Sequence, residues 1–383
     1  MDSKLPDTGT TIFAIMSALS EACNAINLSQ GFPSFDPDQD LLDLVSKYLN
    51  NGANQYAPMP GVAPLREAIA AKVGMLYART VNADTEVTVC DGATEGLFSA
   101  IQATVRPGDE VIVFDPAYDS YEPAVILAGG TCRHIALVTS DEQPDLHIDW
   151  ERLKESINER TRLIILNFPH NPSGVILTAK DLDTLADLVR DTSVYLLSDE
   201  VYEHIIFDGA THESLLKHDE LWQRTFVVSS FGKTYHATGW KVGYCVAPAA
   251  LTSEFRKIHQ WVCYAVITPI QYAIAEYMQG TPQHYAELPA FYEKKRDHFC
   301  DLLKDSNFSF RPARGTFFQI LDYSDITDEE DVAYASKLTR EIGVASIPVS
   351  VFCETKSDDR LLRFCFAKDD AMLEQAAAKL CQL

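Results

Sequence analysis

The chain has 383 residues, of which 46% are hydrophobic and 23% charged, a composition typical of a globular protein with roughly two or three domains. Its formal net charge of -23 disfavours binding to nucleic acid or to anionic membranes, because the mean field repels phosphate groups. No stretch has the apolar length of a membrane span, and no basic lead marks a signal peptide. We therefore expect a cytoplasmic protein without a metal site, whose nine cysteines are reduced thiols.

Strand-like runs alternate with amphipathic stretches through the middle of the chain. Residues 179–190 place Leu182, Leu185 and Leu188 on one face of an expected helix. This alternation predicts an α/β sheet, mostly parallel, with helices on both faces and a ligand site beyond the carboxyl ends of its strands. The expected strands are residues 86–90, 110–115, 162–168, 194–198, 225–229 and 242–247.

The pattern changes after residue 275, where a smaller α+β domain is expected. Its helices are predicted at 289–304, 329–341 and 371–382, and its strands at 316–321 and 361–367. The N-terminal segment contains Gly31, Pro33 and Pro37 and is typical of an irregular arm. We expect three parts: an arm that also joins the small domain at residues 1–45, a large ligand-binding domain at 46–275, and the small domain at 276–383.

The most specific motif is SFGKTYHATGWK, residues 230–241, which follows an expected strand and has glycines on both sides of Lys233. It resembles the lysine motif of class I aminotransferases of fold type I, whose cofactor is pyridoxal 5′-phosphate (PLP). The resemblance implies that Lys233 carries PLP as a Schiff base, and that Ser230 and Lys241 contact its phosphate. Lys241 stands where the family often has arginine. The ordinary alternative is that both lysines are surface charges.

A second segment, LSDEVY at residues 197–202, ends an apolar run with Asp199. Asp199 is similar to the family's aspartate that pairs with the pyridinium nitrogen and keeps the ring protonated. Tyr202 matches the tyrosine that hydrogen-bonds the cofactor's phenolic oxygen. Because the apolar run would bury Asp199, its charge requires a cationic partner. The alternative is that Asp199 is the N-cap of a helix after the strand.

Two other turns follow expected strands. Asn171 begins an Asn-Pro-Ser-Gly sequence that resembles the family's turn, whose asparagine also contacts the phenolic oxygen and the substrate. A plain β-turn is the alternative, because Asn-Pro is a common turn dipeptide. Tyr118 falls where the family stacks an aromatic ring on the pyridine face, although it also suits an ordinary core position.

The turn DGATEG, residues 91–96, links an expected strand to an apolar helix. Its small residues let backbone amides approach a phosphate at the helix N-terminus, where the helix dipole favours an anion. Ala93 and Thr94 match the family's phosphate loop. As a glycine-rich turn alone it would be weak evidence, because many strand-to-helix turns look alike.

Three outlying residues complete the expected site. Arg363 lies within an apolar strand, and its fork of donors suits a substrate α-carboxylate, as in the family; an edge-strand arginine is the alternative. Gly31 matches a glycine near that carboxylate. Tyr56 matches a tyrosine that reaches the phosphate of the neighbouring subunit, which implies a homodimer with shared sites.

The resemblance runs from residue 27 to residue 366 and is closest to bacterial methionine aminotransferases and kynurenine/glutamine aminotransferases. It implies a PLP fold type I architecture: a large α/β domain with a mostly parallel seven-stranded sheet, a smaller α+β domain and an N-terminal arm. The implied reaction is ping-pong transamination between an amino acid and a 2-oxo acid, in which Lys233 serves as general base and acid.

Residues 260–269, where dicarboxylate-preferring relatives carry a second arginine, contain no arginine or lysine. An unpaired distal carboxylate would be costly there, so we expect an uncharged, sizeable donor: methionine, aromatic residues, and kynurenine as a further candidate. A C–S β-lyase would use the same parts. A PLP- or amino-acid-sensing module and a silent scaffold are the non-enzymatic alternatives.

Overall fold

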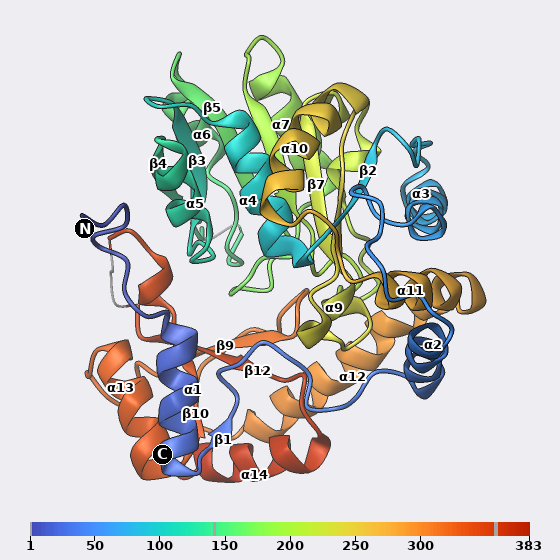
Figure 1. Cartoon of the computed structure of the whole chain (residues 1–383). Helices are drawn as coiled ribbons and strands as arrows, with labels where there is room; N and C mark the ends of the chain where they lie inside the picture. Colours follow the sequence, from blue (N-terminus) through green and yellow to red (C-terminus); the bar gives the residue numbers. More distant parts are fainter. Residues whose placement is uncertain (1, 141–142, 356–358) are drawn as a thin grey trace.

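The computed structural model describes residues 2–140, 143–355 and 359–383, which form a large α/β part above a smaller α+β part in Figure 1. The large part is built on a seven-stranded sheet of order β2-β8-β7-β6-β5-β3-β4. Only β8 runs antiparallel to its neighbours. The strands are β2 (Val87–Cys90), β3 (Glu110–Asp115), β4 (Thr131–Ala136), β5 (Thr161–Asn167), β6 (Tyr195–Asp199), β7 (Thr225–Ser230) and β8 (Gly243–Val246).

Helices cover both faces of this sheet, as the alternating pattern predicts (Figure 1). Successive strand residues enter opposite cores: Ile112 packs with the helices of one face, and Val111 and Val113 pack with those of the other. One face is covered by α3 (Ala63–Tyr77), α6 (Trp150–Ser156), α7 (Ala179–Val189) and α11 (Thr268–Gly280), and the other by α4 (Gly92–Thr104), α5 (Tyr121–Ala128) and α10 (Ala249–Val262). The helix α2 (Gln39–Asn50) packs against α11, and α8 (Asp219–Trp222) and α9 (Phe231–Thr234) are short helices of four residues each.

The smaller part has a three-stranded antiparallel sheet of order β11-β12-β9 and its own aromatic-rich core. Its strands are β9 (Phe318–Asp322), β11 (Ile347–Pro348) and β12 (Leu361–Cys365), and its helices are α12 (His284–Leu303), α13 (Asp331–Lys337) and α14 (Asp370–Leu380). The N-terminal α1 (Ile12–Cys23) packs on this core, and β1 (Ile26–Asn27) pairs in parallel with β10 (Val344–Ala345). The chain's first segment is therefore part of the small unit.

The structure confirms the predicted α/β fold, with one addition and one correction. The seventh strand, β4, was not among the strands read from the sequence, because its residues alternate between exposed and partly buried at the sheet edge. The N-terminal arm is irregular at residues 2–11 and again between β1 and α2, but not throughout, since residues 12–27 form α1 and β1. The domain boundaries at residues 45 and 275 stay predictions. No helix among the described residues is long and apolar enough to cross a membrane.

Candidate functional site

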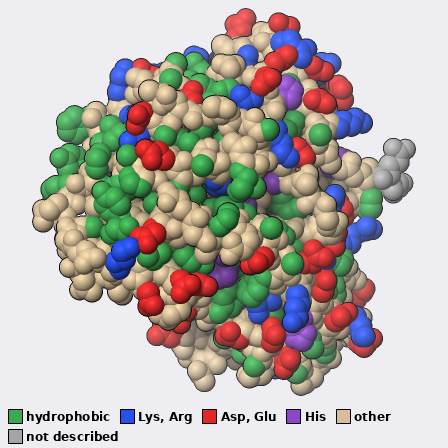
Figure 2. Space-filling view, turned by 90° about the vertical axis from the view of Figure 1, so that its right-hand side faces the viewer, with side chains coloured by type: hydrophobic (Ala, Val, Ile, Leu, Met, Phe, Trp, Pro, Cys, Tyr) green, Lys and Arg blue, Asp and Glu red, His purple; other side chains and the backbone are tan. Residues whose placement is uncertain are grey.

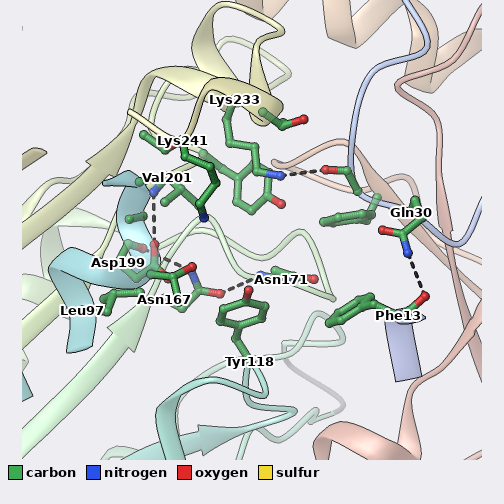
Figure 3. A pocket seen from close by; sticks show the side chains of 18 of the residues that line it. Phe13, Gln30, Leu97, Tyr118, Asn167, Asn171, Asp199, Val201, Lys233 and Lys241 are labelled. Carbon is green, nitrogen blue, oxygen red and sulfur yellow. Dashed lines mark hydrogen bonds between the residues drawn. The ribbon is translucent and has the colours of Figure 1, made fainter. Parts of the chain in front are cut away.

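A cavity of about 310 Å³ lies beyond the carboxyl ends of β5, β6 and β7, between the two parts of the chain. All of the predicted site residues except Tyr56 line it. In Figure 3, Lys233 and Lys241 enter from one wall and Tyr118 from the opposite one, with Asp199 and Asn171 between them. Residues more than 330 positions apart in the sequence thus meet at one place, as the strand-end rule predicts.

Lys233 lies on α9, the short helix that begins where β7 ends. The Ser230 hydroxyl accepts a hydrogen bond from the Gly232 amide at 3.2 Å and caps this helix. Lys233 Nζ donates to the Gly31 carbonyl at 2.7 Å and lies 5.1 Å from the centre of the Phe317 ring. Burial among these groups lowers the pKa of Lys233 to about 8, so a neutral amine is accessible near physiological pH.

Asp199 ends β6 and is only 3% exposed. Its carboxylate accepts hydrogen bonds from the Tyr121 hydroxyl at 2.7 Å and from the Val201 amide at 3.3 Å. Burial raises the pKa of Asp199 to about 6, and no ion pair joins it to a cation among the described residues. No helix begins after it, so the N-cap alternative does not hold. The site thus contains a buried carboxylate that still requires a cationic partner.

Arg363 is 1% exposed and lies on β12, the central strand of the small sheet, which rules out an edge-strand arginine. Its Nη1 donates to Asn171 Oδ1 and its Nη2 to the Ser29 carbonyl, both at 2.8 Å, while Nε has no hydrogen-bond partner among the residues that the structure describes. The guanidinium carbon lies 3.9 Å from the centre of the Phe318 ring. Burial lowers the pKa of Arg363 to about 10, and no carboxylate of the described residues pairs with it.

Tyr202 and Tyr118 form aromatic walls of the cavity. Tyr202 is 3% exposed and packs edge-on against Phe317 and Phe318, and burial raises its pKa well above the usual range. Tyr118 packs against Phe13 from α1, with ring centres 6.4 Å apart, and burial raises its pKa to about 12. Both phenols are therefore neutral hydrogen-bond donors near pH 7.

The turn before α4 supplies a further polar region of the cavity. Asp199 is the one acidic side chain among the described residues that line the cavity. Gly92 has a positive φ of +71°, and a Cβ placed on it would lie 3.0 Å from Lys241 Nζ. Ala93 and Thr94 follow at the N-terminus of this 13-residue helix. Backbone amides, the Ser230 hydroxyl and an ammonium together suit an anion such as a phosphate.

Tyr56 lies outside the cavity and is 82% exposed, in edge-on contact with Tyr264. It belongs to a surface cluster of exposed apolar side chains: Tyr56, Trp261, Val262, Tyr264 and Ile267. Figure 2 shows hydrophobic side chains gathered on one flank of the molecule, while acidic and basic side chains are dense elsewhere. Exposed apolar surface gathered in this way is unusual for a protein that stays monomeric.

The sequence reading missed several residues of the site. Asn167 accepts the Asn171 amide at 3.0 Å and donates to the Asp199 carbonyl at 3.2 Å, so it joins two of the predicted residues. Its position at the end of β5, four residues before the Asn171 motif, was the available signal. Tyr121 lies three residues after Tyr118, but nothing in the sequence shows that it faces Asp199. Gln30, Phe13 and Phe318 also line the cavity.

Residues 24–380 match the model of a protein family described as aminotransferase class I and II. The chain is 49% identical to the methionine aminotransferase of Escherichia coli, covering 100% of this chain and 98% of that protein. A solved structure of an Escherichia coli protein with methionine aminotransferase function covers 100% of this chain and 99% of its own, with a TM-score of 0.97.

Two further similar proteins have other described activities. The structure of N-succinyldiaminopimelate aminotransferase from Mycobacterium tuberculosis is 35% identical, covers 100% of this chain and 99% of its own, and has a TM-score of 0.96. Kynurenine–oxoglutarate transaminase of Dictyostelium discoideum is 34% identical over 98% of this chain and 94% of that protein. The likeness therefore extends over the whole chain in each case.

The burial of Asp199 can be tested through the pH dependence of the stability of the cofactor-free protein. Because the native pKa of about 6 lies above the ordinary 3.8, the native state holds the proton more tightly than the unfolded state. The ionised Asp199 carboxylate therefore lowers the free energy of unfolding at pH values above about 6, and this penalty disappears below about pH 3.8, where the carboxyl group is protonated in both states. We expect Asp199→Asn to raise the free energy of unfolding near neutral pH by up to about 3 kcal/mol, with the gain vanishing below the ordinary pKa.

Urea unfolding of both proteins across this pH range measures the difference. Asp191→Asn, which changes an exposed residue four positions before β6, is the matched control and should show no such pH dependence. Parallel stability profiles for wild type and Asp199→Asn would mean that the Asp199 carboxylate is not desolvated.

Proposed function

We propose, from the premise that this chain belongs to the class I and II aminotransferases, that its amino donor has an uncharged, sizeable side chain. The enzyme is a PLP-dependent aminotransferase that transfers an amino group to a 2-oxo acid. Methionine and aromatic amino acids are the donors proposed here, with kynurenine as a further candidate. One observation carries this choice: three cations line the cavity, and each has a task in every transamination.

The residues of the cavity fit PLP. Asp199 is a buried carboxylate with no ion pair of its own among the described residues, and a protonated pyridine nitrogen is the cation that it lacks. The N-terminus of α4 with Ser230 and Lys241 would hold the phosphate, and Lys233 would carry the cofactor. Tyr118 would lie on the ring face, and Asn171 and Tyr202 would contact the phenolic oxygen.

When bound, PLP supplies the electron sink for the negative charge that develops at the substrate's Cα. Arg363, preorganised by Asn171 and the Ser29 carbonyl, binds the α-carboxylate and fixes the orientation of the Cα–H bond. Lys233 Nζ, with its lowered pKa of about 8, would take the proton from the substrate's Cα and deliver it to the C4′ carbon of the cofactor. Asp199 would hold the ring nitrogen of the cofactor in its protonated form.

The charges of the cavity support an uncharged donor. Lys233, Lys241 and Arg363 are the cations among the described residues that line it, and the proposed roles use all three. A distal carboxylate would therefore be desolvated without a countercharge, which is costly. Phe13, Tyr118 and Phe318 instead offer apolar surface, worth about 1.5–3 kcal/mol for a buried methionine- or phenylalanine-sized side chain.

We also propose a homodimer with shared sites. Tyr56 is 82% exposed and cannot serve the cavity of its own chain in the position described, yet it matches a residue that reaches a neighbouring phosphate. Association through the surface cluster around Trp261 and Tyr264 would cover this exposed apolar surface.

Lys233→Ala is expected to abolish transamination and the absorbance of lysine-bound PLP while the fold remains. The alanine removes both the attachment point and the base, so activity should fall by several orders of magnitude. Lys257→Ala, an exposed lysine on α10, is the control and should behave as wild type. Near-normal turnover, or a PLP adduct that borohydride still traps at this site, would assign the role to another lysine.

A donor panel with one fixed 2-oxo acid tests the specificity. We expect kcat/KM for methionine and phenylalanine to exceed that for aspartate by about one to two orders of magnitude, because the apolar burial is lost and the distal charge is unpaired. Alanine is uncharged but small, so it separates the loss of apolar burial from the effect of the unpaired charge. Its kcat/KM should lie between the value for aspartate and those for methionine and phenylalanine. Aspartate ranking above both larger donors would overturn the proposed specificity.

Hybrid dimers test the sharing of sites. Mixing Tyr56→Phe chains with Lys233→Ala chains should give hybrids in which one site carries both changes and the other carries neither. Activity after subunit exchange should therefore exceed the sum of the separate proteins. The hybrids must be verified by differential tags, and a verified hybrid without restored activity, or a monomer in sedimentation, would contradict the proposal.

A further inference from the structure

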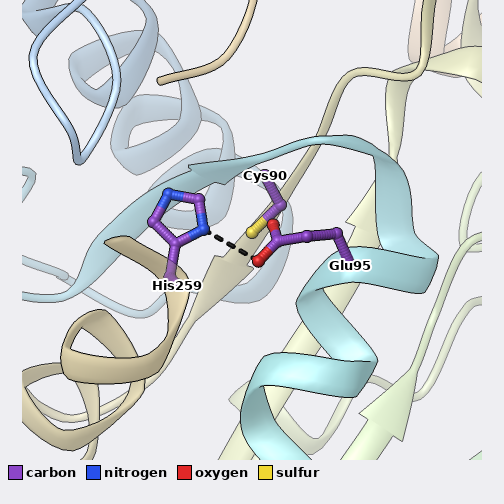
Figure 4. Close-up of side chains that lie close together, drawn as sticks. All are labelled: Cys90, Glu95 and His259. Atoms are coloured by element: carbon purple, nitrogen blue, oxygen red, sulfur yellow. Dashed lines mark hydrogen bonds and ion pairs between the residues drawn. The ribbon is translucent and has the colours of Figure 1, made fainter. Parts of the chain in front are cut away.

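Three polar side chains that the catalytic cavity does not use lie together behind the turn before α4. Figure 4 shows Cys90 at the end of β2, Glu95 in the first turns of α4 and His259 near the end of α10. Their ligand-type atoms all lie within 4.8 Å of one another. The turn in front of them, Gly92–Thr94, lines the cavity where the cofactor's phosphate is proposed to bind.

His259 is fully buried, and acceptors face both of its ring nitrogens. Nε2 lies 3.2 Å from the Met59 carbonyl, which can only accept, so Nε2 carries a hydrogen. Nδ1 lies 2.9 Å from Glu95 Oε1. A hydrogen must lie between these two atoms as well, on the imidazole or on the carboxyl group. In either case the Glu95–His259 pair has no net charge.

Glu95 also holds the turn in place. Its Oε2 accepts the Asp91 amide at 3.2 Å, and its Oε1 accepts the Ser99 hydroxyl at 2.6 Å. The carboxyl group therefore ties the start of the turn to α4, and the residues that follow Asp91 line the cavity. Without His259, the same group would be a buried anion beneath the helix N-terminus, where it would repel a phosphate and compete with it for the helix dipole.

The residue types of this cluster also occur in transition-metal sites, but the hydrogen bonds argue against a metal here. Both nitrogens of His259 and both oxygens of Glu95 are already engaged. The Cys90 thiol donates to the Thr88 carbonyl at 3.6 Å, and burial raises the Cys90 pKa well above its usual value, which disfavours the thiolate that a metal needs.

We propose that His259 is a positioning residue for the cofactor's phosphate: by sharing one proton with Glu95, it cancels a buried negative charge directly behind the phosphate-binding turn. Glu95 holds the turn through the Asp91 amide, and its pairing with His259 allows the Glu95 carboxyl group to lie behind a bound anion without repelling it. This inference rests on the proposed placement of the phosphate at Gly92–Thr94, Ser230 and Lys241.

The test compares the binding of PLP with that of pyridoxal, which lacks the phosphate, to the full-length cofactor-free enzyme. Dissociation constants of both ligands are measured by absorbance titration for wild type, His259→Gln, Glu95→Gln and the double variant. Lys257→Gln removes an exposed positive charge two residues from His259 and is the matched control.

His259→Gln should weaken PLP binding by about tenfold or more and pyridoxal binding by less than about threefold. The reason is that the uncompensated Glu95 carboxylate repels the phosphate group, which pyridoxal lacks. Glu95→Gln should change PLP binding by less than about threefold, since an amide can donate to Nδ1 and still accept from the Asp91 amide. The double variant should recover the PLP affinity that His259→Gln loses. Lys257→Gln should match wild type.

Equal weakening of PLP and pyridoxal by His259→Gln, or no recovery in the double variant, would overturn the proposal and leave a purely structural role. A stoichiometric metal in the wild type that His259→Gln loses, measured by elemental mass spectrometry, would overturn it in favour of a metal site. If His259→Gln does not fold, Glu95→Gln still decides, because a tenfold loss of PLP affinity there contradicts a charge-neutral pair. Wild type that fails to bind PLP would instead refute the placement of the cofactor.

Discussion

A protein interior tolerates a charge only where that charge meets a partner, and this constraint organises the catalytic cavity. Asp199, Lys233 and Arg363 face it, and no ion pair among the described residues satisfies any of them. Burial shifts all three toward their neutral forms, raising the pKa of Asp199 and lowering those of Lys233 and Arg363. In the proposed function, cofactor and substrate would supply the missing opposite charges, so their binding would offset a cost of charge burial that the fold already imposes.

The walls behind the cavity show the opposite arrangement, in which buried charges satisfy one another. Lys72 Nζ lies 2.6 Å from Glu203 Oε1, and the Tyr244 hydroxyl donates to the same oxygen at 2.7 Å. Glu203 directly follows Tyr202, so this network fixes the turn after Asp199 from behind. The Glu95–His259 pair does the same for the turn before α4. Buried polar groups outside the cavity are thus hydrogen-bonded to one another, and they position the turns that carry the unpaired charged groups of the cavity.

The small unit and the N-terminal segment complete the site. Lys233 donates to the Gly31 carbonyl, and Arg363 donates to the Ser29 carbonyl and to Asn171. These contacts join the arm, the large sheet and the small sheet at one point.

The sequence by itself determined the alternating α/β pattern, the lysine motif around Lys233 and the carboxylate at a strand end, because these depend on local periodicity and on residues close together in the chain. It did not reveal β4, whose alternating exposure at the sheet edge gives no apolar run. Only the tertiary structure decided that Tyr121 faces Asp199, that Asn171 accepts a hydrogen bond from Arg363, and that His259 lies within hydrogen-bond distance of Glu95. Each of these contacts joins residues from separate elements, and such contacts depend on how the chain packs rather than on any pattern along it.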